Sequence, residues 1–199
     1  MASFAPCNVQ SDRLFPTSPS CTEQTVALSL LDATTANFSA TSAIWLYERP
    51  AHTPGNKLNL ADHLHKSLWV ALNAYPQWCG RLKSIASLNE TALPLAPHAR
   101  RFGRVYIKYG TPNDPGVEFR TATSKATLDE LHPISRPINP PLCSREEVPL
   151  DVFLPANQLA YALHPVVVND AGIFPPVLAI QLTYLACGGF VLAIKGAHP

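Results

Sequence analysis

The last stretch of the chain, Phe174–Pro199, constrains the fold more than any other part. It holds all but the first residue of the only long apolar run, Ile173–Ile194, which a glutamine, a threonine, two prolines and a Gly-Gly pair interrupt. A membrane-spanning helix needs about 20 consecutive, predominantly apolar residues, so these interruptions argue against a span. Buried β-strands accommodate shorter apolar runs. The stretch therefore predicts two buried strands joined at Gly188-Gly189, with His198 directly after the second strand.

Composition places the chain among globular proteins. It has 20 prolines in 199 residues, about twice average usage, and prolines divide a chain into short elements. Hydrophobic residues make up 47% and charged residues only 15%, so part of the surface is expected to be covered, for example by another domain. The net charge is +1 with scattered basic residues, which predicts no nucleic-acid partner and no membrane surface.

Cysteine usage and the N-terminus indicate the compartment. The five cysteines, at positions 7, 21, 79, 143 and 187, are widely spaced and form no CxxC pair. An odd number at long spacings argues against a disulfide framework and favours a reducing compartment. The first residues have neither a basic nor an apolar region of the kind found in secretory signals. We therefore expect a cytoplasmic protein.

One segment predicts an amphipathic helix. Asn59 is a suitable N-cap, Asp62 lies in the first turn where the helix dipole favours an anion, and Pro76 ends the pattern. Apolar residues recur at spacings of three and four, which predicts one buried face formed by Leu60, Leu64, Leu68, Ala71, Leu72 and Tyr75.

The other segments predict a sheet with short connections. Strands are expected at Thr41–Tyr47, Gly80–Ala86, Arg104–Gly110 and Gly116–Thr123. Thr123 or Ser124 is a candidate cap for a short helix, and the proline-rich segment 133–149 is expected to be an extended surface segment. Residues 1–24 are interpreted as an extended N-terminal arm and residues 25–199 as one mixed α/β domain.

Several residues invite a chemical interpretation that their context weakens. His63 and His65 lie about 200° apart on the predicted helix and cannot share a metal ion. Cys187 is interpreted as a small buried thiol within an apolar strand, and Cys79 as a packing residue. No glycine-rich phosphate loop is present.

Two further histidines are candidate general bases. His164, with Asn169 and Asp170, fits an oriented base or a surface turn equally well. His198 ends a buried strand, where a general base is common. The local pattern by itself favours an ordinary histidine near a chain end.

Three segments in order resemble the BAHD acyltransferases, the CoA-dependent family of plant and fungal secondary metabolism. Leu28–Glu48 resembles the family's opening Leu-Ser-x-Leu-Asp segment with its aromatic strand. Leu64–Leu82 matches Leu-x-x-Ser-Leu-x-x-x-Leu, then Tyr-Pro and Gly-Arg-Leu. Pro175–Pro199 matches Gln-x-Thr, Cys-Gly-Gly and the start of the HxxxD motif.

The resemblance implies an α/β domain of the chloramphenicol-acetyltransferase-like type, with a mixed sheet flanked by helices. It implies His198 as the catalytic general base that activates an alcohol or amine acceptor toward an acyl-CoA cosubstrate, with no metal and no bound cofactor. It also implies a C-terminal domain as an intramolecular or separate-chain partner. The family aspartate would be residue 202, beyond this sequence, and the DFGWG-type motif is not found.

Several interpretations therefore stay open at the level of sequence. The chain is expected to be the N-terminal half of an acyltransferase, as a fragment, one chain of a split enzyme or a natural truncation, and to be inactive alone. The alternatives are a non-catalytic binding or scaffold half-domain, a truncated remnant, or a relative of condensation domains. Condensation domains carry two adjacent histidines, and here Ala197 occupies the first position.

Overall fold

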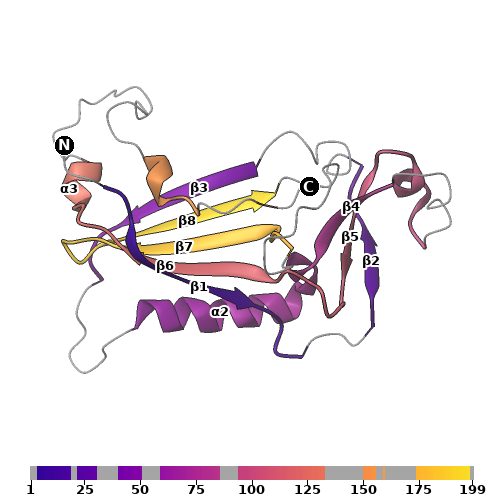
Figure 1. The fold of residues 1–199 in the computed structure, drawn as a ribbon, viewed down its shortest axis with the longest axis horizontal. Helices are drawn as coiled ribbons and strands as arrows, with labels where there is room; N and C mark the ends of the chain where they lie inside the picture. Colours follow the sequence, from indigo (N-terminus) through magenta and orange to yellow (C-terminus); the bar gives the residue numbers. More distant parts are fainter. Residues whose placement is uncertain are drawn as a thin grey trace.

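The computed structural model describes residues 4–18, 22–30, 40–50, 59–85, 94–132, 150–155, 159 and 174–197. Within them, two β-sheets lie side by side, and one long helix runs along the larger sheet (Figure 1). His198, His164 and segment 133–149 lie outside the described residues, so the predictions made for them are not tested.

The larger sheet has five strands in the order β1-β6-β7-β8-β3. Their bounds are β1 Cys7–Leu14, β3 Ala40–Tyr47, β6 Val117–Thr123, β7 Leu178–Tyr184 and β8 Phe190–Ala197. The β6–β7 pair is parallel and the other three pairs are antiparallel. The predicted mixed sheet is confirmed.

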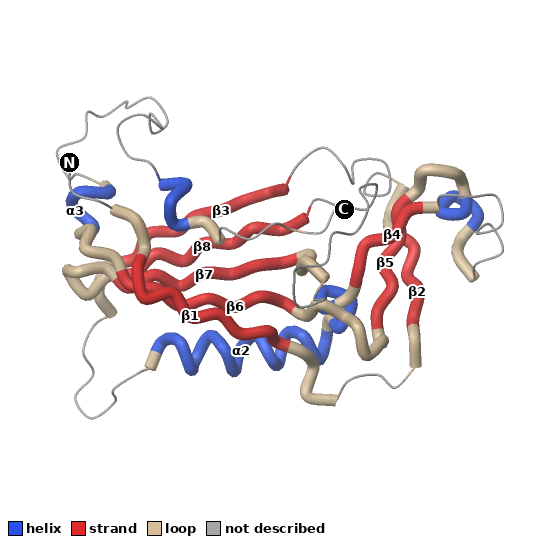
Figure 2. Tube along the Cα trace, viewed as in Figure 1, coloured by secondary structure: helices blue, strands red, loops and turns tan. Residues whose placement is uncertain are grey.

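The smaller sheet has the order β2-β5-β4, with both pairs antiparallel. Its strands are β2 Gln24–Ala27, β4 Arg81–Ser84 and β5 Val105–Tyr109. Short 3₁₀ turns stand beside it, η1 at Pro76–Cys79 and η3 at Pro97–Arg100. Figure 2 shows this sheet at one end of the larger one.

Helix α2, Leu60–Ala74, covers one face of the five-stranded sheet (Figures 1 and 2). The predicted N-cap is confirmed, because the Asn59 side chain accepts a hydrogen bond from the Asp62 amide. Leucines four residues apart form the stripe that packs on the sheet. Ala71 and Tyr75 were wrongly placed on this face: both are exposed, because they lie beside the stripe.

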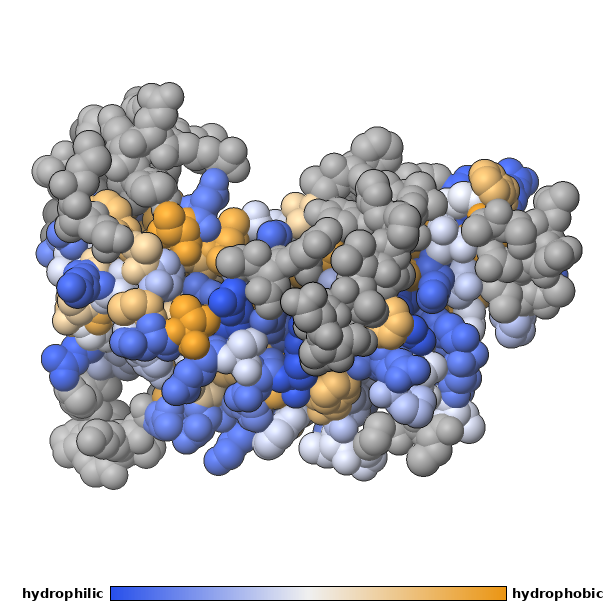
Figure 3. Space-filling model, viewed as in Figure 1, coloured by the Kyte–Doolittle hydropathy of each residue, from blue (hydrophilic) through white to orange (hydrophobic). Residues whose placement is uncertain are grey.

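The opposite face of the sheet carries α3, Leu128–Leu131, and the 3₁₀ turn η4, Leu150–Phe153. Leu131 and Phe153 pack on Val191, which points away from α2. Apolar colours gather beside η4 in Figure 3, whereas hydrophilic colours follow the outer side of α2. The cap of α3 is Thr127, in a capping box with Glu130, and not Thr123 or Ser124 as predicted. Ser124 instead donates to the Phe4 carbonyl.

The N-terminal residues form part of the larger sheet. Strand β1 comes from the segment expected to be an arm, and Leu14 at its end is buried in the core under α2. The division between residues 24 and 25 stays a prediction. Among the described helices, none is both long and apolar enough to pass through a bilayer.

Candidate active site

Strand β8 ends one residue before His198, the predicted general base, in the sequence. Its last residue, Ala197, is buried and pairs with Ala40 of β3. On its other side, the Ala197 amide donates to the Val177 carbonyl at 2.7 Å. Neighbouring strands therefore hold the backbone on both sides immediately before His198 in the sequence.

An apolar cluster surrounds this strand end. It joins the two sheets, because its members come from β4, β5, β7, β8 and the segments beside them. The cluster consists of Leu82, Val105, Leu159, Val177, Ala179 and Ala197, each less than a tenth exposed. A backbone hydrogen bond in such a buried, apolar setting is electrostatically stronger than one in water.

The Gly-Arg-Leu motif reaches the same region from the end of α2. Gly80 has no room for a side chain, since a Cβ atom would lie 2.6 Å from the Lys108 carbonyl oxygen. Leu82 belongs to the apolar cluster. The Arg81 guanidinium lies over the Phe174 ring, 4.6 Å from its centroid. The motif thus connects the helix to the segment that enters β7.

The Gln-x-Thr motif has a structural role. Gln181 and Thr183 are both buried and point away from α2. The Gln181 amide donates to the Phe153 carbonyl at 3.0 Å and to the Thr183 hydroxyl at 3.3 Å. The bond to Phe153 attaches the η4 turn to the middle of the sheet.

The Cys-Gly-Gly motif forms the turn between β7 and β8. Gly188 has φ of 84°, and a Cβ atom on Gly189 would lie 2.6 Å from the Tyr47 carbonyl oxygen. At Gly189 the backbone of β3 therefore approaches too closely for a side chain. The prediction for Cys187 is wrong: the thiol is exposed in the turn, and its sulfur accepts from the Leu128 amide at 3.3 Å.

Cys79 lies in a different environment. It is buried, and its thiol donates to the Leu14 carbonyl at 3.5 Å. Its pKa is raised to about 12, mainly because burial disfavours the charged thiolate; a backbone hydrogen bond from Val117 lowers the pKa, and the nearby Asp114 raises it. Its place among the buried core residues confirms the packing interpretation, and a thiol with such a raised pKa is protonated at neutral pH.

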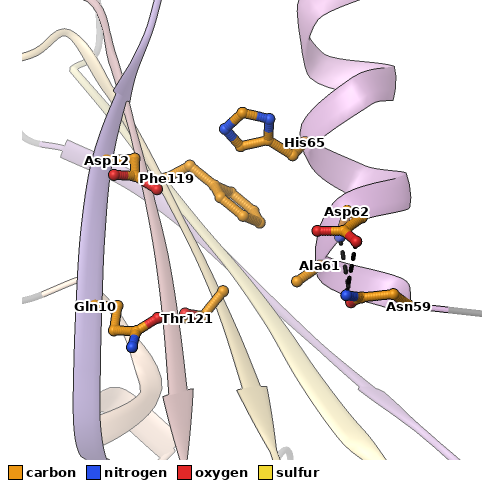
Figure 4. A pocket seen from close by; sticks show the side chains of 8 residues that line it. All are labelled: Gln10, Asp12, Asn59, Ala61, Asp62, His65, Phe119 and Thr121. Atoms are coloured by element: carbon orange, nitrogen blue, oxygen red, sulfur yellow. Dashed lines mark hydrogen bonds between the residues drawn. The ribbon is translucent and has the colours of Figure 1, made fainter.

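A polar cleft of about 340 Å³ lies between α2 and strands β1 and β6 (Figure 4). Its side chains come from Gln10, Asp12, Asn59, Ala61, Asp62, His65, Phe119 and Thr121. His65 meets the Phe119 ring edge-on, with centroids 5.8 Å apart, and is half-buried.

The cleft and the end of β8 are separate places. The first turn of α2 contacts Tyr184 through the Ala61 amide. Tyr184 ends β7, whereas Leu178 at the start of β7 pairs with Gly196. No group of three metal-ligating side chains occurs among the described residues. His63 is exposed on the helix, outside the lining of the cleft.

Sequence reasoning missed the cleft and the stacking of Arg81 on Phe174. The cleft joins residues of β1, α2 and β6, which only the strand order brings together. The sequence holds a weak signal for the stacking, since Arg81 stands in one matched segment and Phe174 directly precedes another, but local periodicity marks neither residue.

Comparison with characterised proteins identifies relatives. No family model matches the chain. The chain is similar to the acyltransferase AFT15-1 of Alternaria alternata, with 29% identity over 194 residues. This match covers 94% of the chain and 33% of the relative, so the chain spans about a third of that protein's length. The resemblance to the BAHD acyltransferases is confirmed.

One solved structure supports the fold. The crystal structure of vinorine synthase, a BAHD enzyme, matches with a TM-score of 0.55 and 19% identity, over 95% of this chain and 37% of that one. The structure of F. graminearum TRI101 complexed with ethyl coenzyme A matches with a TM-score of 0.46 and 16% identity, over 89% and 35%. The expected α/β fold of the BAHD type is confirmed by the first match.

Proposed function

We propose that this chain is the N-terminal part of an acyl-CoA-dependent O- or N-acyltransferase of secondary metabolism. The observation that carries the proposal is the match to an acyltransferase along 94% of the chain. Within that span the three BAHD-like segments stand in family order. The fold agrees, because the matched segments form the helix, the turn and the paired strands that the resemblance implies.

His198 is the proposed general base. The buried pairing of Ala197 with β3 and its bond to Val177 support this role, because a catalytic group needs a backbone held in a defined position. A neutral imidazole takes the proton from the acceptor hydroxyl or amine as its oxygen or nitrogen attacks the thioester carbonyl carbon. The C–S bond then breaks, and the imidazolium returns the proton to the CoA thiolate.

Further chain is proposed to complete the enzyme. The chain spans a third of its acyltransferase relative, and the family builds its site between two domains. We propose that the other domain supplies much of the acyl-CoA site and that residues 1–199 alone do not catalyse transfer, because the thioester would not be positioned. The three cysteines in the described ranges are free thiols, which supports a reducing, cytoplasmic compartment.

The test replaces His198 in the full-length gene product. We expect His198→Ala to lower kcat for acyl transfer by about 10²–10⁴-fold, the usual contribution of a general base, with acyl-CoA saturating. His63→Ala is the matched control, since His63 is exposed on α2, and it should retain wild-type turnover. Near wild-type turnover of His198→Ala would contradict the role of His198 as the general base. A wild-type protein without transfer activity toward a panel of alcohols and amines would favour the scaffold alternative.

A further inference from the structure

Arg81 is held in a fixed orientation at the junction of the two sheets. Its Nη2 donates to the Thr111 hydroxyl at 3.4 Å. That hydroxyl donates in turn to the Asp114 carboxylate at 2.5 Å, and the same carboxylate accepts from the amides of Gly110 and Thr111. The turn after β5 thus fixes one edge of the guanidinium plane.

The flat face of the guanidinium is used for stacking. It lies over the Phe174 ring with 4.6 Å between Cζ and the ring centroid. The Arg81 Nε is buried and makes no hydrogen bond in the part of the chain that the structure describes. A lysine would have no planar face for this contact. The stacking contact therefore requires the planar shape of arginine, although it leaves the buried Nε donor without a hydrogen bond.

A stiff segment connects Phe174 to the end of β8. Pro175 and Pro176 follow Phe174, and each proline ring locks its φ angle. The residue before a proline is also restricted to extended conformations. Val177 comes next, and its carbonyl accepts the Ala197 amide at 2.7 Å. If the Phe174 ring is fixed, the stiff Pro175-Pro176 segment also fixes Val177, and the hydrogen bond from the Ala197 amide then restrains the backbone immediately before His198.

We infer that Arg81 is a positioning residue for the proposed active site. By stacking on Phe174 it holds the Pro175-Pro176 segment in place, and the Val177 carbonyl in turn holds the last residue of β8. The inference rests on the proposed function for its catalytic consequence. The mechanical link itself is a property of the 199-residue chain and is measurable without catalysis.

Amide hydrogen exchange in the 199-residue chain tests the link. We expect Arg81→Met to speed exchange of the Ala197 amide by at least about tenfold, because a local opening of the strand end becomes easier. Arg81→Lys should give a similar increase, since it keeps the charge and loses the stacking. The Leu185 amide, bonded to the Gly189 carbonyl at the other end of the hairpin, should keep its rate. Arg101→Met, at an exposed arginine, is the matched control.

Phe174→Leu tests the same contact from the other side and covers the case in which Arg81→Met does not fold. It should speed Ala197 exchange as well, and the Arg81→Met/Phe174→Leu double variant should add little to either single change. Unchanged Ala197 exchange in folded Phe174→Leu or Arg81→Met would overturn the inference, as would equal acceleration at Leu185.

Kinetics of the full-length protein test the catalytic consequence. We expect Arg81→Met and Arg81→Lys to lower kcat by at least about tenfold with the KM for acyl-CoA nearly unchanged, since a loss confined to kcat marks misplacement of a catalytic group. Faster exchange with unchanged kcat would overturn the catalytic part and leave the proposed function standing. An inactive wild-type protein would contradict the proposed function. The hydrogen-exchange rate of the Ala197 amide would still decide whether Arg81 restrains the end of β8.

Discussion

Cys79 and Cys187 are residues of the same type whose surroundings give them different exposure to solvent. Both stand in segments that resemble the BAHD family, but Cys79 is buried against the Leu14 carbonyl and Cys187 is exposed in a turn. Burial raises the pKa of Cys79 to about 12. The thiolate is the reactive form of cysteine, so burial both limits access to Cys79 and disfavours its reactive form.

We predict that the folded chain treated with a maleimide at pH 8 is modified rapidly at Cys187 and only very slowly at Cys79. With a pKa of about 12, roughly one Cys79 thiol in ten thousand is ionised at pH 8. The thiolate fraction, and with it the slow rate, should rise about tenfold per pH unit below that pKa. Peptide mass spectrometry after timed quenching measures both sites. Unfolding in guanidinium should make the two rates similar, and rapid native labelling of Cys79 would contradict the burial.

At the scale of elements, the β7–β8 turn depends on a contact with a third strand. Gly189 precedes β8, and a Cβ atom there would meet the Tyr47 carbonyl oxygen of β3 at 2.6 Å. Gly196, near the other end of β8, has only the Leu178 Cδ1 atom at 3.8 Å from its added Cβ, an ordinary contact. Two glycines of one hairpin thus differ in the space around them.

We predict that Gly189→Ala lowers the free energy of unfolding by about 1–3 kcal/mol, the usual cost of overpacking. Gly196→Ala should change it by no more than about 1 kcal/mol, because a tolerated alanine mainly restricts the unfolded chain. Urea denaturation followed by circular dichroism measures both variants against the wild type. Equal effects of the two substitutions would show that the approach of β3 does not decide the stability of this turn.

For the whole molecule, the α2 face of the larger sheet is only partly covered. Trp45 and Tyr47 belong to β3, the last strand of the described sheet, and remain 43% and 41% exposed. Tyr47 stacks on Phe190 with ring centroids 4.7 Å apart. Exposed aromatic side chains beside an edge strand favour association with another surface.

We predict that the 199-residue chain associates at micromolar concentrations and that Trp45→Lys with Tyr47→Lys reduces this association. Sedimentation velocity across a concentration series measures it. Phe102→Lys is the control, because Phe102 is 74% exposed next to the smaller sheet. A monodisperse wild-type monomer would contradict the prediction and favour the scaffold alternative over a half of a two-domain enzyme.

The local elements of this fold were accessible from sequence because their signals are local. The four-residue leucine spacing and Asn59 predict α2 to within a turn, and the expected strands from Thr41 to Thr123 match β3, β4, β5 and β6 closely. The cap of α3 failed, since three neighbouring hydroxyl residues compete and only the capping box with Glu130 selects Thr127. The buried state assigned to Cys187 failed because the turn begins two residues earlier than the apolar pattern suggests.

The sequence by itself determined the classes of element, the resemblance to an acyltransferase family and the residue proposed as its base. Tertiary structure decided the pairing of β7 between β6 and β8, the contact of Gly189 with β3, and the stacking of Arg81 on Phe174. Periodicity reports which face of an element is apolar, but not which distant element meets it. Those contacts depend on strand order and register, which arise only when the whole sheet is assembled.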